Sequence, residues 1–185
     1  APVALKALIA REYSESALRH FEQEFRTLTG LAHPNLTEVY DFGRVRLPDG
    51  SREVPFFTME YVEGETLGRY LARTGLDFPR LYSLLAQVGQ ALAYLHVRGV
   101  VHQDVKTSNI LVAPDGGGGP RVKLMDLGLA GRPTEGGESG SIRGTVAYLA
   151  PAAARGGPSD PRSDLYSLGC VVYEAVSGRP PFQGA

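Results

Sequence analysis

The sequence has a single cysteine, and this scarcity excludes one class of protein. One cysteine cannot form a disulfide within the chain, so a disulfide-stapled fold is excluded. Cys170 lies in the apolar stretch 165–176, where we expect a small buried hydrophobic residue, a reactive thiol being the less favoured alternative. A chain without disulfides fits a reducing, cytoplasmic setting best.

Long apolar runs and an excess of one charge are also absent. No segment of about 18 consecutive apolar residues occurs, and the N-terminus lacks the basic and then apolar pattern of a signal peptide. We therefore expect no membrane contact from this segment. The formal net charge is -1, so the chain lacks the basic field that attracts nucleic acids, and no nucleic-acid partner is expected.

The composition that is present is that of an ordinary globular protein. The chain has 185 residues, of which 43% are hydrophobic and 21% charged, enough for one substantial core or two small lobes. The first residues already have the pattern of a strand, and the last follow directly on a helix. We therefore expect a chain that is cut at both ends.

The first third of the chain predicts a small, strand-rich lobe with one helix. Residues 3–9 are apolar except for Lys6, which predicts a mostly buried strand that carries a functional charge. Apolar residues recur every three or four positions in 14–30, which predicts an amphipathic helix with Glu24 beside its apolar stripe. Two further strands, 36–42 and 54–61, are expected to be joined by a turn at 48–50.

The rest of the chain predicts a mainly helical lobe that begins after a short connection at Gly64. A leucine-rich stripe over 81–95 predicts a long helix that ends at Gly99. Two short apolar runs, 110–113 and 121–125, predict a β-hairpin with a loose glycine-rich turn.

The last part combines a polar segment with a final helix. Residues 130–145 are rich in glycine, serine and threonine, which is typical of a mobile surface segment open to regulation. Asp160 and Pro161 are typical of a helix start, and the stretch 165–176 is apolar nearly all round, so we expect this helix to be buried.

The predicted hairpin places two metal-binding residue types together. Asn109 precedes its first strand and Asp126 follows its second, so the antiparallel pairing should bring them to one end. An amide oxygen and a carboxylate are hard ligands suited to Mg²⁺, which usually keeps waters and substrate phosphates as its other partners. Asp104 lies five residues earlier on a polar loop and is a candidate to accept a proton from an attacking hydroxyl.

Five short motifs follow one another along the chain: VALK (3–6), HQDVKTSN (102–109), MDLG (125–128), GTVAYLAP (144–151) and SDLYSLG (163–169). In this order and spacing they resemble the motifs of protein kinases, in particular bacterial Hanks-type serine/threonine kinases. The segment FTMEYVEGETL (57–67) also resembles the kinase hinge. Each residue alone has an ordinary structural explanation, but their joint spacing favours the kinase interpretation.

The resemblance implies a role for each matching polar residue. Lys6 would hold the α- and β-phosphates of ATP and be oriented by Glu24. Asp104 would orient and deprotonate the substrate hydroxyl, and Lys106 would offset charge on the transferring phosphoryl group. The resemblance also implies that Asn109 and Asp126 hold two Mg²⁺ ions.

The resemblance implies an adenine site and a class of acceptor as well. Ala4 and Leu111 would sandwich the adenine, Met59 would be the gatekeeper, and the backbone of Glu60 and Val62 would bind the adenine edge. Lys106 together with Thr145 is similar to the serine/threonine pattern rather than the tyrosine pattern. In the family, Asp164 hydrogen-bonds the backbone of the catalytic loop.

The chain departs from the kinase pattern at several positions. Gln103 replaces an arginine that in many kinases pairs with a phosphate on the activation segment. We therefore hypothesise that activity does not depend on phosphorylation through this pocket, although three residues remain possible phosphosites: Thr134, Ser139 and Ser141. Loss of activity on replacing all three by alanine would contradict this. Leu127 replaces the phenylalanine of DFG, Ala152 replaces the glutamate of APE, and no glycine-rich loop precedes Val3.

The expected fold is α+β, a two-lobed protein-kinase-like fold incomplete at both ends. Residues 1–62 would form a partial small lobe and hinge, and 63–185 a partial large lobe with catalytic loop, activation segment and central helix. The expected function is transfer of the ATP γ-phosphate to Ser or Thr of protein substrates in signalling, with ATP and Mg²⁺ as cofactors and possible regulatory domains outside the segment. Alternatives are a pseudokinase or ATP-binding scaffold, a catalytically weak fragment, and a small-molecule phosphotransferase, which GT…AP disfavours.

Overall fold

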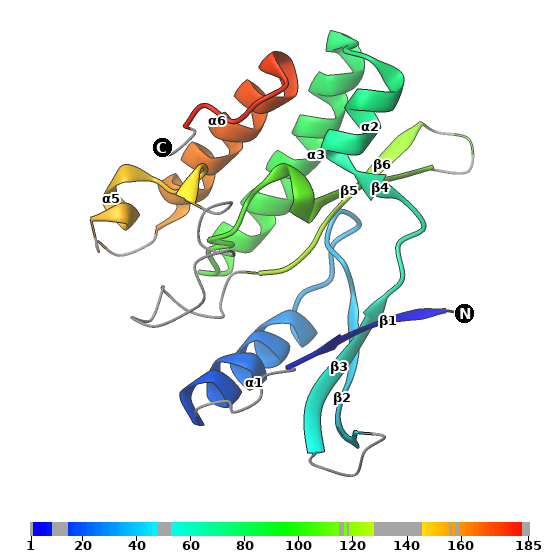
Figure 1. Cartoon of the computed structure of the whole chain (residues 1–185), viewed down its shortest axis with the longest axis vertical. Helices are drawn as coiled ribbons and strands as arrows, with labels where there is room; N and C mark the ends of the chain where they lie inside the picture. The colour runs from blue at the N-terminus through cyan, green and yellow to red at the C-terminus, as the bar shows by residue number, and fades with distance from the viewer. Residues whose placement is uncertain are drawn as a thin grey trace.

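The chain folds into a small sheet-containing lobe and a larger, mainly helical lobe (Figure 1). The computed structural model describes residues 2–8, 15–47, 53–114, 117, 119–127, 146–155, 157 and 160–182. Several predictions therefore lie outside the described residues: the turn at 48–50, the polar segment 130–145, the possible phosphosites Thr134, Ser139 and Ser141, and Thr145.

The small lobe is a three-stranded antiparallel sheet covered by one helix. Its strands are ordered β1-β3-β2, and the sequence predicted all three and the helix. The bounds are β1 Val3–Ala7, α1 Glu15–Thr29, β2 Val39–Arg46 and β3 Glu53–Glu60. The apolar face of α1 supplies Phe21 and Phe25, whose rings pack on Phe42 and Phe57 of the sheet. This aromatic cluster packs α1 on β2 and β3, and β3 pairs with the strand that carries Lys6.

The prediction that the first strand is mostly buried was wrong. Val3 and Leu5 are more than half exposed. Among the described residues, β1 pairs only with β3, which makes it an edge strand with one face open to solvent. Lys6 lies opposite Phe57 in this pairing, on the face that turns toward α1.

The large lobe is built around a long helix and a second small sheet. The predicted helix is α3, Phe78–Val97, and it buries Leu84, Val88, Leu92 and Leu95. Gly99, at φ 71, ends it with a backbone conformation that favours glycine. The predicted hairpin is β5 Ile110–Pro114 and β6 Pro120–Leu124; two elements that the sequence did not predict, β4 Glu65–Thr66 and α2 Leu67–Thr74, precede α3.

The last elements are a short helix, α5 Pro151–Ala154, and α6 Pro161–Ser177. Asp160 caps α6 by accepting hydrogen bonds from the backbone of Arg162 and Ser163, with Pro161 at the helix start, as predicted. The prediction that α6 is buried all round was wrong. It packs one face against α2 and α3, and Cys170 is buried, while four apolar side chains on its other face are exposed: Leu165, Val172, Tyr173 and Val176.

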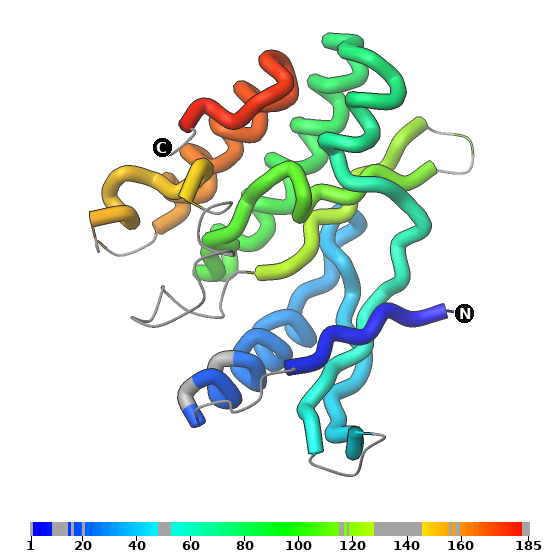
Figure 2. The backbone as a smooth tube through the Cα atoms, viewed as in Figure 1, coloured from blue at the N-terminus to red at the C-terminus, as the bar shows by residue number. Residues whose placement is uncertain are grey.

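The segment between α1 and β2 joins the two lobes. Leu124 of β6 donates its N–H to Asn35 O at 2.8 Å and accepts from Thr37 N at 3.1 Å. Figure 2 shows this segment reaching from the small lobe to the hairpin of the large lobe. The buried core is correspondingly continuous through both lobes. The division at residues 62 and 63 stays a prediction.

No helix in the described ranges is both long and apolar enough to cross a bilayer.

Candidate active site

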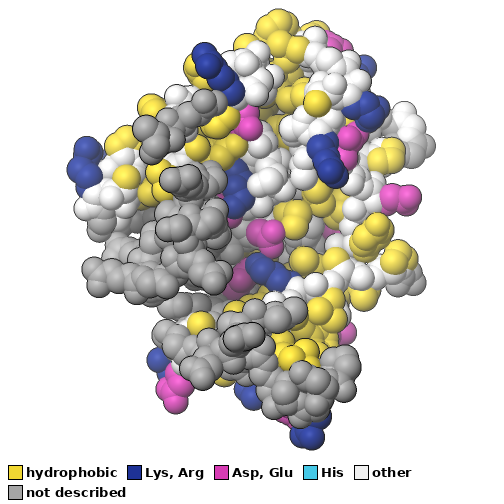
Figure 3. Space-filling model, viewed as in Figure 1, with side chains coloured by type: hydrophobic (Ala, Val, Ile, Leu, Met, Phe, Trp, Pro, Cys, Tyr) yellow, Lys and Arg dark blue, Asp and Glu magenta, His cyan; other side chains and the backbone are white. Residues whose placement is uncertain are grey.

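Lys6 connects the two lobes through two ion pairs. Its Nζ lies 2.6 Å from Glu24 Oε1 on α1 and 3.0 Å from Asp126 Oδ1, which follows β6 in the large lobe. These three residues are far apart in the sequence and come from three different elements. Acidic and basic side chains accordingly adjoin at the junction of the lobes in the middle of the face shown in Figure 3.

Burial and charge oppose each other at the Lys6–Glu24 pair. Burial is the largest effect on Lys6 and lowers its pKa, but Asp126 and Glu24 together raise the pKa above its ordinary value. Burial raises the pKa of Glu24, because its side chain is only 1% exposed and its Oε2 has no hydrogen-bond partner among the described residues. The charge of Lys6 opposes that rise. Removal of either partner would therefore leave the charge of the other without compensation.

Segment 102–109, which the kinase resemblance identifies as the catalytic loop, folds around Asp104. Lys106 Nζ lies 2.7 Å from Asp104 Oδ2. The side-chain amide of Asn109 donates to the same carboxylate oxygen at 2.8 Å and to the Asp104 carbonyl at 2.9 Å. The structure thus brings these three predicted residues together, and two donors hold the Asp104 carboxylate in one orientation.

Asp164 on α6 fixes the backbone just before Asp104. Its side chain is 1% exposed and accepts hydrogen bonds from His102 N and Gln103 N, both at 2.8 Å. These are the backbone contacts that the resemblance implied for Asp164. Gln103 adopts φ 67, in the left-handed region, where a residue other than glycine is strained. The Asp164 carboxylate offsets this strain with two charge-assisted bonds.

His96 is a partner of Asp164 that the sequence analysis did not identify. Its Nε2 lies 2.7 Å from Asp164 Oδ2, although His96 belongs to α3 and precedes Asp164 by 68 residues. The sequence gives no signal for this pairing, because it depends on how α3 and α6 pack. His102, by contrast, is buried, and burial lowers the pKa of its ring, while its Nδ1 accepts from Asp104 N at 3.3 Å.

The candidate metal ligands lie at the same end of the hairpin, as predicted. Ile110 pairs with Leu124, and Met125 N donates to Asn109 O at 3.0 Å, so Asn109 and Asp126 flank this end. Asp126 adopts φ 57. Among the described residues, no group of three or more His, Cys, Asp or Glu side chains could hold a metal by itself. One carboxylate and one amide oxygen fit Mg²⁺, which takes its remaining ligands from water and phosphate.

The residues expected around adenine come from both lobes. Ala4 lies opposite Met59 in the β1–β3 pairing, and Val3 lies opposite Glu60. Val62 follows β3 in the connection between the lobes. Leu111 lies on β5 and pairs with Lys123. Their contact with a nucleotide stays a prediction.

Lys123 ties this connection to the large lobe, and the sequence analysis did not single it out. Its Nζ lies 2.6 Å from Glu60 Oε2 and donates to Leu36 O at 3.2 Å. The same Glu60 oxygen accepts from Glu38 N at 3.3 Å. Glu60, expected to contribute only its backbone, therefore has a side chain held from both lobes.

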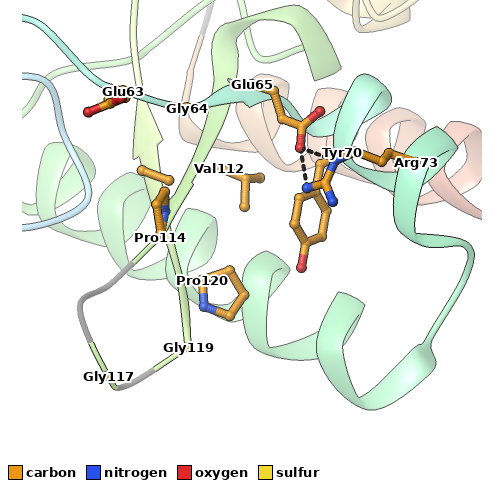
Figure 4. A pocket seen from close by; sticks show the side chains of 11 residues that line it. Glu63, Gly64, Glu65, Tyr70, Arg73, Val112, Pro114, Gly117, Gly119 and Pro120 are labelled. Atoms are coloured by element: carbon orange, nitrogen blue, oxygen red, sulfur yellow. Dashed lines mark hydrogen bonds and ion pairs between the residues drawn. The ribbon is translucent and has the colours of Figure 1, made fainter.

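A pocket of about 710 Å³ lies beside the connection between the lobes (Figure 4). Glu65 and Arg73 form an ion pair on its wall, next to Tyr70. Val112 lines the pocket, whereas Leu111 does not. None of the residues expected around adenine lines this pocket.

Three departures from the kinase pattern lie within the described residues: Gln103, Leu127 and Ala152. Leu127 is 3% exposed and belongs to the core, so the position takes an apolar residue. Ala152 lies in α5 and is exposed. The hypothesis about Gln103 and the activation segment stays a prediction, because the possible phosphosites lie outside the described residues.

Comparison with known sequences finds a family match along the whole chain. The sequence profile described as protein kinase domain matches residues 1–185. Serine/threonine-protein kinase PknA of Mycobacterium tuberculosis is 40% identical over 98% of this chain, and PknB of Mycolicibacterium smegmatis is 39% identical over 97%. The matches span 42% and 28% of those proteins, so the chain covers less than half the length of either relative.

Comparison with solved structures finds the same fold. The crystal structure of the Mycobacterium tuberculosis PknI kinase domain superposes with a TM-score of 0.70 and 30% identity, covering 98% of this chain and 66% of that chain. A single-site mutant of the same domain gives a TM-score of 0.71 with 28% identity, covering 97% of this chain and 65% of that chain.

Proposed function

The chain belongs to the protein kinase family, and from this membership and its site we propose that it transfers the γ-phosphate of ATP to serine or threonine hydroxyls of proteins. The relatives that carry a serine/threonine-protein kinase name support the choice of acceptor. The intact set of Lys6, Asp104, Asn109 and Asp126 supports catalysis over a scaffold role.

The observation that carries the proposal is the double ion pair of Lys6. One cation held between a helix of the small lobe and the hairpin of the large lobe places a positive charge at the lobe junction. Phosphoryl transfer depends mainly on positioning and charge stabilisation, since there is little covalent chemistry for the protein to perform. In this proposal Lys6 binds the α- and β-phosphates, and Glu24 orients it.

The catalytic loop supplies the groups for the acceptor. Asp104 accepts a hydrogen bond from the substrate hydroxyl and takes its proton as the new P–O bond forms and the bond to the leaving phosphate breaks. Lys106, 2.7 Å from Asp104, offsets negative charge on the phosphoryl group. Asn109 keeps the Asp104 carboxylate in place through its side-chain amide.

Asn109 and Asp126 are the residues that would hold Mg²⁺. Their oxygens are the ligand types that Mg²⁺ prefers, and their two-residue set leaves places for phosphate oxygens. When bound there, Mg²⁺ neutralises charge on the phosphates. Ala4, Met59, Leu111 and the backbone at Glu60 and Val62 form the adenine site in this proposal.

The partners follow from this chemistry. The substrates are proteins with accessible serine or threonine, and regulatory domains attached outside this segment would provide the signal. The buried Cys170 fits a reducing, cytoplasmic location, which cell fractionation would test.

A transfer assay tests the proposal. The purified protein is incubated with γ-³²P-ATP, Mg²⁺ and a generic protein acceptor, and labelled phosphoserine and phosphothreonine are measured. Asp126→Ala should lower the rate by at least about a hundredfold, because a group that acts on the transition-state charge is removed. Asp41→Ala, at an exposed position on β2, is the matched control and should leave the rate unchanged.

The outcomes separate the rival functions. Nucleotide binding without transfer, and no difference between the parent protein and Asp126→Ala, would support a scaffold and overturn the proposal. Transfer to a small hydroxyl compound but to no protein would support a small-molecule phosphotransferase instead.

A further inference from the structure

The catalytic loop is connected to α6 at a second point, after Asp104, which the kinase resemblance did not assign. Thr107 Oγ1 lies 3.3 Å from the hydroxyl of Tyr148. The same hydroxyl is hydrogen-bonded to Glu174 Oε2 on α6. Thr107 is buried and Tyr148 is half-buried, so water competes little for these bonds.

The chemistry of the three groups fixes the direction of the chain of bonds. A tyrosine hydroxyl has one hydrogen, and a carboxylate can only accept, so Tyr148 donates to Glu174. The Thr107 hydroxyl must then donate to Tyr148. Burial and the bond to Glu174 raise the pKa of Tyr148 to about 12, so the phenol keeps its hydrogen at neutral pH.

α6 holds Tyr148 at two places. Ser167 Oγ donates to the Tyr148 carbonyl at 2.8 Å, while Glu174 holds the hydroxyl. Ser167 and Glu174 follow Asp164 by three and ten residues, which places all three on one face of the helix. This polar face is the signal in the sequence, because Ser167 and Glu174 interrupt the apolar stretch 165–176 on the side of Asp164.

The two attachments lie on either side of the catalytic residues. Asp164 holds the backbone at 102 and 103, and the Thr107–Tyr148–Glu174 chain holds the loop at 107. Asp104 and Lys106 lie between them. A small cavity of about 10 Å³ lies beside Asp104 and Tyr148.

We propose that Thr107, Tyr148 and Glu174 are positioning residues that hold the loop after Asp104, so that Asp104 and Lys106 keep their place relative to the acceptor hydroxyl. This inference rests on the proposed kinase function. The three residues act through the loop, and none of them takes part in proton or phosphoryl transfer.

Thr107→Val tests the proposal with Thr107→Ser as its matched partner. Valine has nearly the shape of threonine but no hydroxyl, whereas serine keeps the hydroxyl. We expect Thr107→Val to lower kcat about fivefold to tenfold, as loss of one hydrogen bond would, and to leave the KM for ATP unchanged. Thr107→Ser should keep most of the kcat of the parent protein. Tyr148→Phe should add little to Thr107→Val, because both break the same chain.

Amide hydrogen exchange provides a readout that needs no activity. In the nucleotide-free protein, exchange at 103–107 should be several-fold faster in Thr107→Val than in Thr107→Ser or the parent. Tyr148→Phe, which leaves position 107 intact, should give the same acceleration and serves as the second variant if Thr107→Val fails to fold.

The outcomes distinguish this inference from the proposed function. Equal kcat and equal exchange in the valine and serine variants would overturn the positioning role while leaving the kinase function intact. A parent protein that transfers no phosphoryl group would overturn the function, and the exchange rates alone would then decide whether the chain of bonds holds the loop.

Discussion

Among single residues, Glu24 is a buried carboxylate whose unfavourable burial is compensated by its ion-pair partner. The carboxylate is almost fully buried, and only one of its oxygens has a hydrogen-bond partner among the described residues. An isolated buried charge would be strongly unfavourable, and the Lys6 ammonium 2.6 Å away compensates for it. This ion pair therefore holds α1 close to the Lys6 ammonium.

The raised pKa of Lys6 predicts how stability changes with pH. A lysine whose folded-state pKa is raised contributes stability that is complete below its ordinary value of 10.5 and is lost as pH rises through the folded-state pKa. We expect the difference in unfolding free energy between the parent protein and Lys6→Met to be constant from about pH 7 to 9 and to shrink above 10.5. Urea unfolding followed by circular dichroism at each pH measures it.

The control for this experiment is Lys123→Met, which removes a different ion-paired lysine. Its partner is Glu60 rather than Glu24 or Asp126, so its pH profile gives the background for loss of a lysine elsewhere in the fold. A Lys6→Met difference that grows above pH 10.5 would contradict the assignment of the raised pKa to these ion pairs.

The ion pair between Lys123 and Glu60 predicts an effect on nucleotide affinity. Lys123 holds the Glu60 side chain, and the Glu60 backbone is expected to bind adenine. Lys123→Met should raise the KM for ATP about threefold to tenfold and leave kcat nearly unchanged, because ATP binding is weakened equally in the ground state and in the transition state. Steady-state kinetics at varied ATP measures both. A fall in kcat at constant KM would argue against this role.

Among the elements, the contact of β4 with β5 depends on one glycine. A Cβ on Gly64 would lie 2.6 Å from the carbonyl oxygen of Val112, which is backbone and cannot turn aside. Gly64→Ala should therefore push β4 away from β5 and destabilise the fold by about 1–3 kcal/mol. Chemical denaturation gives the free energy of unfolding.

Gly68 provides the matched control for this prediction, since it lies four residues later in α2. A Cβ there would meet nothing within 4 Å. Gly68→Ala should stabilise the protein by about 0.5–1 kcal/mol, because alanine has the higher helix propensity. Equal effects of the two substitutions would show that the close approach at Gly64 is unimportant.

Regular elements were predictable from the sequence, and their burial was not. The spacing of Phe21, Phe25 and Leu28 gave α1, and the apolar runs on either side of the glycine-rich turn gave the hairpin, because local periodicity determines such elements. The exposure of Leu5 and of Leu165 depends on which faces other elements cover, and periodicity carries no information about that. The two-residue strand β4 was too short to give a pattern.

The candidate site was predictable to a similar extent. The kinase resemblance implied that Glu24 orients Lys6, and the two side chains form an ion pair; the second ion pair of Lys6, with Asp126, was not predicted. His96 and Thr107 were not found, because their partners lie 68 and 41 residues away and the pairings depend on tertiary packing.

For the whole molecule, Asn35 is a buried link between the lobes. Its side-chain amide donates to Val122 O and to Gln87 Oε1, both at 2.9 Å, and Gln87 in turn accepts from Val122 N. Asn35→Ala should lower the free energy of unfolding by about 1–3 kcal/mol, because it leaves buried partners unsatisfied. Urea unfolding followed by circular dichroism measures it, since the sequence has no tryptophan for fluorescence.

Asn35→Ala should also reduce the cooperativity of unfolding. The backbone of the same segment carries the hydrogen bonds to Leu124, so loosening it separates the small lobe from the hairpin. We expect a broader transition with a lower m-value than in Gln23→Ala, an exposed α1 position used as control. A transition of unchanged width would indicate that the lobes remain coupled through other contacts.

The ion pairs of Lys6 also determine how a triphosphate is received. An ammonium group has three hydrogens, and two of them already point to Glu24 and Asp126. A phosphate oxygen can take the third, or replace the Asp126 carboxylate as that residue turns to a cation. In the proposed function, binding of a triphosphate is thus an exchange of anions around the Lys6 ammonium, and the heat released should fall short of what the number of new contacts suggests.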